Sequence, residues 1–210
     1  LDTTSSDMTT ASNLYDQICK HINQFIEENN FAAVFTISAG ILPLPDLSQT
    51  GYAELIKRTD FSLTMAKQHG RNCCYIFQEE EYQNFLRIRE ITNELHSAVN
   101  HGFRGFSIIF QPVMDIQQDK LTGAEVLIRF ASKKFGPISP AEFIPLLETS
   151  RLIIPTGRWF MREAITACLK IRMQIPDFKV NINVSQVQIT KSDVITDLIS
   201  EMNASGLPPA

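Results

Sequence analysis

Carboxylate, amide, hydroxyl and guanidinium side chains occupy most of the alternate positions in two short segments of this chain. In each segment, residues 124–130 and residues 178–185, the intervening positions carry small or branched apolar side chains. The side chains that would share the more polar face are Glu125, Leu127 and Arg129 in the first segment, and Asn181, Asn183 and Ser185 in the second. Because successive side chains of a β-strand point to opposite faces, each segment predicts a strand with one polar face. Such a face is costly to enclose unless its groups pair or bind a ligand.

The segment 106–116 also reads as a strand, and only the four residues QQDK separate it from the strand expected over 121–130. Parallel neighbours need a crossover of about a dozen residues or more, so this short connection predicts an antiparallel hairpin. Within the first strand, Gln111 would share a face with Ile109 and Val113.

After this hairpin the expected elements are longer and alternate in type. They are a helix that begins at Pro140, a helix over 156–173, the strand 178–185 and a helix over 192–203. Ser139 and Glu142 have the spacing of a capping box around Pro140. Strand, helices, strand and helix in this order predict a parallel α/β structure with its site at the carboxyl ends of the strands. Glu148 either faces that site or is an exposed residue of its helix.

The residues before position 103 predict a separate organisation. A helix around 14–26, an extended run over 33–42, a helix over 52–69 and a strand over 73–77 form an αβ pattern, and a charged helix follows over 79–100. We therefore expect a first domain over 1–78, a helical connector over 79–102 and a second domain over 103–210.

The composition of the chain bears on its binding partners and on its cellular compartment. The 19 Lys and Arg and 23 Asp and Glu give a net charge of −4 with mixed signs, which argues against duplex nucleic acid. The longest apolar run, 32–45, is too short and too interrupted for a membrane span. Four cysteines without a zinc-like spacing favour a reduced, cytoplasmic protein. The first residue, Leu1, and the segment 205–209 lead us to expect a piece of a longer protein.

Four motifs in order carry a resemblance to a known family: FQPVMD, AEVLIRF, GPISPAEFIPLLETSRLIIPTGRW and VNINVS. Together they resemble the opening half of EAL-domain cyclic di-GMP phosphodiesterases and cover residues 103–210. The tripeptide that names the family reads EVL here, and its central Val126 is expected to face away from the polar side. The resemblance implies part of a TIM-like (βα) barrel whose first strand is antiparallel.

The resemblance also implies a site. By position, Glu125 and Asn183 would ligate a divalent metal, and Arg129 would bind a phosphate of cyclic di-GMP, with Gln111 and Leu127 as further substrate-binding candidates. Oxygen donors suit Mg²⁺ or Mn²⁺, and a two-metal site activates water for phosphodiester hydrolysis. The general base and the remaining ligands are expected beyond this chain, which by itself is expected to be inactive.

Two upstream motifs, TISAGI and TDFSLTMAKQHGRN, resemble the closing half of a GGDEF diguanylate cyclase domain, an α+β cyclase-like fragment. That resemblance implies that Lys67 and Arg71 contact the phosphates of GTP. Thr64 stands where the family usually has tyrosine. The alternative is an amphipathic helix that ends at Gly70 and carries solvated basic side chains.

Three hypotheses follow for the whole protein. The first is a cyclic di-GMP phosphodiesterase, the second a receptor that binds cyclic di-GMP without cleaving it, and the third an interaction module. For single residues the alternatives are a solvated carboxylate at Glu125, a hydrogen-bonded amide at Asn183 and an ion pair at Arg129. An open strand edge would also favour association of copies into a homo-oligomer.

Overall fold

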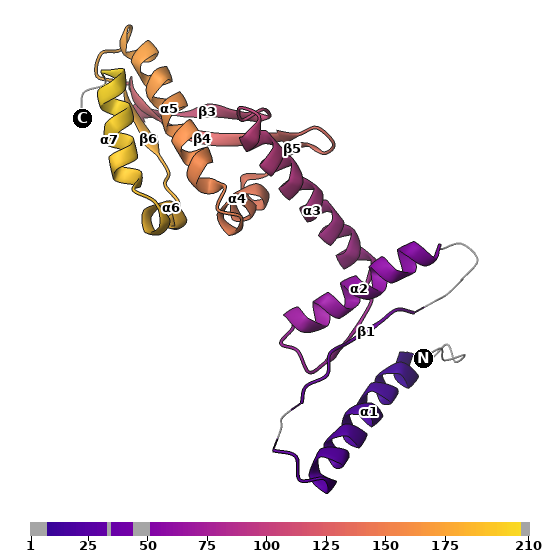
Figure 1. Cartoon of the computed structure of the whole chain (residues 1–210). Coiled ribbons are helices and arrows are strands. Elements are labelled where there is room, and N and C mark those ends of the chain that lie inside the picture. Colours follow the sequence, from indigo (N-terminus) through magenta and orange to yellow (C-terminus); the bar gives the residue numbers. More distant parts are fainter. Residues whose placement is uncertain (1–7, 33–34, 44–50, 207–210) are drawn as a thin grey trace. The chain divides into compact units, whose positions relative to one another are not determined.

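The computed structural model describes residues 8–32, 35–43 and 51–206, and these form two compact units (Figure 1). The division falls between Leu86 and Arg87, inside the continuous helix α3, Glu79–Asn100. The helix predicted over 79–100 therefore forms with the expected bounds, and it contributes to both units. No helix among the described residues is long and apolar enough to cross a membrane.

The first unit contains two short parallel strands and the helix between them. Its elements before α3 are α1 (Met8–Glu28), β1 (Ala39–Ile41), α2 (Tyr52–Gln68) and β2 (Cys74–Ile76). A Cβ at Gly40 of β1 would lie 2.4 Å from the backbone nitrogen of Leu63 in α2, so only glycine permits this close approach. Phe61 of α2 is buried among aromatic rings. Residues 33 and 34 of the predicted extended run lie outside the described residues.

The second unit is built on a sheet in which β4 is central. Its strands are β3 (Phe106–Asp115), β4 (Lys120–Ser132), β5 (Gly136–Ile138) and β6 (Lys179–Ile182). Strand β4 is antiparallel to β3 and β5 and parallel to β6. The predicted hairpin and the predicted parallel third strand are confirmed, whereas β5 was not predicted, and the sheet is mixed. At Gly123 a Cβ would lie 2.5 Å from the carbonyl oxygen of Lys179, so β4 and β6 meet at a glycine.

Four helices accompany this sheet: α4 (Pro140–Thr149), α5 (Ile153–Arg172), α6 (Gln186–Lys191) and α7 (Val194–Ser205). The prediction of a strand up to Ser185 was wrong, because β6 ends at Ile182 and Ser185 is the N-cap of α6. A serine followed three residues later by Gln188 is a helix start, and that signal overrides the alternation that continues past Ile182. Helix α7 ends at Gly206, whose φ of 72° suits glycine.

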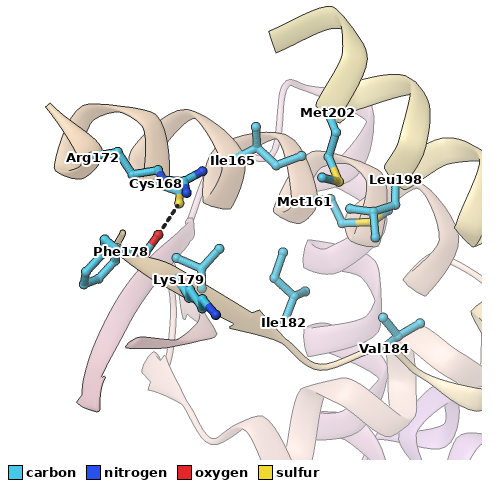
Figure 2. Close-up of a pocket in the computed structure, with 11 residues that line it drawn as sticks. Met161, Ile165, Cys168, Arg172, Phe178, Lys179, Ile182, Val184, Leu198 and Met202 are labelled. Carbon is cyan, nitrogen blue, oxygen red and sulfur yellow. Dashed lines mark hydrogen bonds between the residues drawn. The ribbon is translucent and has the colours of Figure 1, made fainter. Parts of the chain in front are cut away.

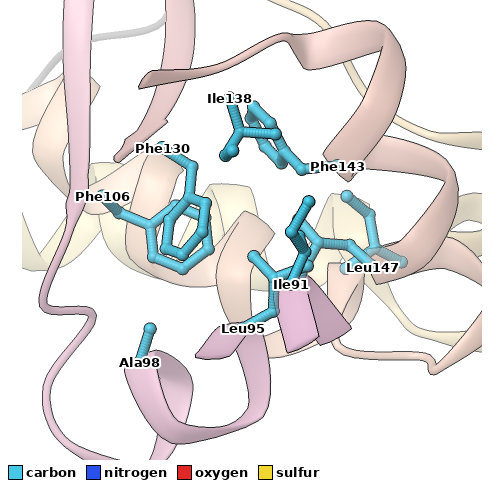
Figure 3. Close-up of a cluster of buried hydrophobic side chains, with 9 residues drawn as sticks. Ile91, Leu95, Ala98, Phe106, Phe130, Ile138, Phe143 and Leu147 are labelled. Carbon is cyan, nitrogen blue, oxygen red and sulfur yellow. The ribbon is translucent and has the colours of Figure 1, made fainter. Parts of the chain in front are cut away.

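The apolar face of the sheet packs against the helices. Val126 is fully buried and packs with Phe160 and Ala164 of α5, as the alternation predicts. A neighbouring cluster joins α3, the sheet and α4 (Figure 3). Its central side chains are Ile91, Leu95, Phe106, Phe130, Phe143 and Leu147. Val184 is one of the intervening apolar positions of the segment 178–185, and the alternation predicts that it packs on this face; it is 40% exposed instead, because it lies beyond the end of β6.

The predicted capping box at the start of α4 was wrong in its side-chain contacts. Helix α4 begins at Pro140 with Ser139 as N-cap, as expected, but the Ser139 side chain makes no capping hydrogen bond. Glu142 instead accepts hydrogen bonds from Arg87 of α3, at 2.9 Å from Nε and 3.2 Å from Nη2. A bidentate pair with a guanidinium has replaced the local contact to the backbone.

Candidate functional site

Glu125 occupies the middle of the central strand β4. In the sheet register it lies opposite Gln111 of β3 on one side and opposite Asn181 of β6 on the other. Residues paired in this way project to the same face. Glu125 is half-buried, whereas Gln111 and Asn181 are exposed. The polar face predicted from the alternation is therefore present, and solvent reaches it.

The structure brings Glu125 and Asn183 into direct contact. Asn183 follows the last residue of β6, and its Nδ2 donates a hydrogen bond to Glu125 Oε1 at 2.6 Å. The two residues are 58 positions apart in sequence, so the parallel pairing of β4 with β6 makes this contact. A hydrogen bond to an ionised carboxylate is among the stronger ones available to an amide.

These two side chains offer oxygen donors of the kind that hard divalent cations prefer. The Asn183 amide carries a carbonyl oxygen beside the nitrogen that contacts Glu125, and a half-turn about its last bond exchanges the two atoms. Among the described residues no group of three or more His, Cys, Asp or Glu forms a metal cluster. The residues present thus fit one part of a cation site, a carboxylate beside an amide oxygen.

Leu127 and Arg129 continue along the same face of β4. Both are half-buried, and Leu127 lies opposite Ile109 of β3. Arg129 is four residues from Glu125, about 13 Å along the strand. Its Nη1 donates a hydrogen bond to the carbonyl oxygen of Ile128 at 2.8 Å. A guanidinium has five N–H donors, so Arg129 retains donors for an anion while the backbone fixes its orientation.

Ser185 and Glu148 form a contact next to this pair that the sequence analysis did not identify. The Ser185 hydroxyl donates to Glu148 Oε1 of α4 at 2.5 Å. The two residues are 37 positions apart, and no local pattern links them. The spacing of Ser185 and Gln188, by contrast, is that of a capping box and indicates a helix start. The interpretation of 178–185 as a strand missed this signal.

An apolar pocket lies between α5, β6 and α7 (Figure 2). Ile165 of α5, Val184 and Met202 of α7 are among its lining residues. Burial raises the pKa of the Cys168 thiol at its edge, which keeps the sulfur protonated at neutral pH. Most of the lining is apolar, and Arg172 and Lys179 are the charged side chains among its lining residues.

In the first unit, the two basic residues singled out by the sequence are both exposed. Lys67 is in the last turn of α2, and Arg71 follows Gly70 with a φ of 61°. Their role as nucleotide contacts stays a prediction.

The comparison with protein families decides the classification of the second unit. The model of the EAL domain matches residues 92–210, which is more than half of the chain. The chain belongs to the EAL domain family. The matched region of this EAL chain contains the whole β3–β4–β5–β6 sheet and the Glu125–Asn183 contact.

Curated proteins related to this EAL chain are much longer than it is. An uncharacterized protein of Synechocystis sp. is 32% identical over 156 residues, which are 74% of this chain and 22% of that protein. The bifunctional diguanylate cyclase/cyclic di-GMP phosphodiesterase MucR of Pseudomonas aeruginosa is 25% identical over 95% of this chain and 29% of its own length. The cyclic di-GMP phosphodiesterase PdeR of Escherichia coli is 27% identical over 81% and 26%, respectively. The chain thus spans less than a third of each relative.

Solved structures agree with the family. The EAL enzyme Bd1971, in a form with cAMP and cyclic di-GMP bound, is 25% identical with a TM-score of 0.54, covering 76% of this chain and 42% of that one. The MucR phosphodiesterase in complex with cyclic di-GMP is 24% identical with a TM-score of 0.53, covering 57% and 48%, and supports the fold alone. The α/β class predicted from the sequence is confirmed.

Proposed function

We propose that the whole protein hydrolyses cyclic di-GMP to the linear dinucleotide with divalent cations, and that Glu125 and Asn183 bind one of these cations. The observation that carries the proposal is the 2.6 Å contact between the two side chains on the polar face of an EAL sheet. Relatives named as cyclic di-GMP phosphodiesterases support the choice of substrate. The sheet would then be the opening part of a TIM-like barrel.

Within this proposal each residue of the β4 face has a distinct task. The Glu125 carboxylate and the Asn183 amide oxygen bind the cation, and the Arg129 guanidinium binds a phosphate of the substrate. Gln111 and Leu127 complete the surface beside the dinucleotide. When bound, Mg²⁺ or Mn²⁺ would activate water and offset charge on the phosphoryl oxygens. The other ligands would come from residues outside this chain.

The family tripeptide that reads EVL here does not argue for a receptor that lacks catalysis. Val126 is fully buried and packs against Phe160 and Ala164, so the larger side chain alters packing on the helix side of the sheet. Glu125 projects to the other face and keeps its carboxylate. The hydrolase remains the preferred reading.

We further propose that residues 1–78 belong to a GGDEF-like domain in which Lys67 and Arg71 contact GTP. The match to MucR supports this extension, because it covers 95% of the chain and that relative is named as bifunctional. The thiols of the four cysteines suit a cytoplasmic protein. The edge of β6 that faces away from β4 pairs with no described strand and would allow copies to associate.

The test of the hydrolase is the substitution Glu125→Gln in the whole protein. The change keeps the shape of the side chain and removes the charge that holds the cation, so hydrolysis of cyclic di-GMP should fall by about 10²-fold or more. The 210-residue chain alone should show no hydrolysis. The matched control is Glu142→Gln, which alters a carboxylate paired with Arg87 and should leave turnover unchanged. Near-normal turnover of Glu125→Gln in saturating Mg²⁺ or Mn²⁺ would remove Glu125 from the site.

A further inference from the structure

The segment that carries Asn183 to the site is anchored to α4 at Ser185. Ser185 lies two residues after Asn183, and its hydroxyl donates to Glu148 Oε1 while accepting from the backbone N–H of Val187 at 3.1 Å. The donor proton and an acceptor lone pair of the hydroxyl are thus both engaged, which fixes its orientation. Helix α4 therefore holds the chain at the point where β6 passes into α6.

A second anchor comes from α5. Gln188 accepts a hydrogen bond from the backbone N–H of Ser185 at 3.1 Å and is only 5% exposed. A Cβ added to Gly157 of α5 would lie 2.0 Å from Gln188 Nε2, so the glycine provides the space for this amide. The segment from Ser185 to Gln188 is thereby held at its first residue by α4 and packed at its last residue against α5.

Asn183 itself lies outside the regular strand. It is exposed and follows the last residue of β6, so the strand ladder does not hold it. A side chain in such a segment loses conformational freedom when it binds, and prior fixation of its backbone lowers that cost. The hydrogen bonds of Ser185 fix the backbone in this way two residues after Asn183.

Another carboxylate on the same helix gives a contrast. Glu142, in the first turn of α4, pairs with Arg87 of α3 and has no contact with the segment 183–188 among the described hydrogen bonds. Glu148, near the end of α4, contacts Ser185 instead. Glu142 therefore contributes to the packing of α4 with α3, whereas Glu148 contacts the segment that carries Asn183.

We propose that Glu148 is a positioning residue that, through Ser185, holds Asn183 in place against Glu125. The proposal rests on the proposed function for the role of Asn183 as a cation ligand. Outer contacts of this kind orient metal ligands, and their loss typically weakens metal binding by about 10- to 100-fold. Glu148 would therefore set the affinity for the cation without touching it.

The test uses the 210-residue chain and two readouts. The first is the NMR signal of the Asn183 side-chain amide, assigned by its loss in Asn183→Asp, and the second is the affinity for Mn²⁺. Glu148→Ala should shift the amide signal toward that of a solvated amide and weaken Mn²⁺ binding about tenfold. Glu148→Gln should restore both readouts, because its amide oxygen can still accept from Ser185.

Two further variants keep the test decisive. Glu148→Asp retains the charge but shortens the side chain, so it should shift the Asn183 signal even if Glu148→Ala fails to fold. Glu142→Ala should lower stability and leave both readouts unchanged, because it removes only the contact with Arg87.

The outcomes separate this proposal from the one on which it rests. An Asn183 signal that stays unchanged in folded Glu148→Ala or Glu148→Asp would overturn the positioning role. A signal that shifts in a chain that binds no Mn²⁺ even as wild type would support positioning and contradict the cation site. A shifted Asn183 signal together with weaker Mn²⁺ binding in Glu142→Ala would show that any damage to α4 has the same effect, and would also overturn the proposal.

Discussion

Two helix starts in this molecule share a serine and a carboxamide or carboxylate three residues later, yet only one forms the reciprocal cap. At α6, Ser185 accepts from the backbone and Gln188 accepts from the N–H of Ser185. At α4, Ser139 makes no side-chain cap, and Glu142 pairs with Arg87. The same local spacing therefore leads to two different structures.

The difference lies in the partners that tertiary structure offers to the third residue. Glu142 is charged and partly exposed, and a guanidinium on α3 gives it two charge-assisted hydrogen bonds. Gln188 is neutral and nearly fully buried, so its oxygen would be left without a partner if it turned away from Ser185. A capping sequence thus makes the cap available, and competing partners decide whether it forms.

Among the variants that distinguish the two helix starts, Gly157→Ala should have the largest effect on stability. The added methyl group would occupy the place of Gln188 Nε2 and break the cap of α6, lowering the free energy of unfolding by about 1–3 kcal/mol. Chemical denaturation measures the change. Adding Gln188→Ala should cost less than its effect in the wild type, because the clash is then relieved. Strictly additive effects would contradict the contact between the two residues.

Ser185→Ala should have the next largest effect. It removes the cap and leaves Glu148 without its hydroxyl partner, so we expect a loss of about 1–2 kcal/mol in the free energy of unfolding. Ser185→Thr keeps the hydroxyl and should retain most of the stability. The matched change Ser139→Ala removes a side chain that makes no cap and should stay within about 0.5 kcal/mol of the wild type. Equal losses at the two serines would refute the distinction between the two helix starts.

Arg87→Ala should have the smallest effect on stability. It tests directly whether Arg87 is what prevents the capping box at the start of α4. The ion pair is partly exposed to solvent, so its loss should matter less at high salt. Glu142 is then released and can turn back to the N–H of Ser139, forming the box that its spacing allows. Slower hydrogen exchange at the Ser139 amide in the variant would show this. Unchanged exchange would mean that something other than Arg87 prevents the box.

Much of the second unit follows from local pattern. The four-residue connection between β3 and β4 requires a hairpin, and the alternation in β4 places Glu125 and Val126 on opposite faces, as observed. The helix over 79–100 has the expected bounds because its apolar residues recur at helical spacing. Strand β5 escaped prediction, since three residues carry no period of their own.

What the sequence by itself determined is the direction of each side chain within its own strand or helix, because that depends only on residue spacing. Only the tertiary structure decided which groups meet across long separations. The contact of Asn183 with Glu125 needs the register of β6 on β4, and the contact of Ser185 with Glu148 needs α4 to lie beside the end of β6. The fate of Glu142 likewise depended on Arg87, 55 residues away. Polar groups choose among partners by desolvation and geometry in the folded molecule, and neither is written in the local sequence.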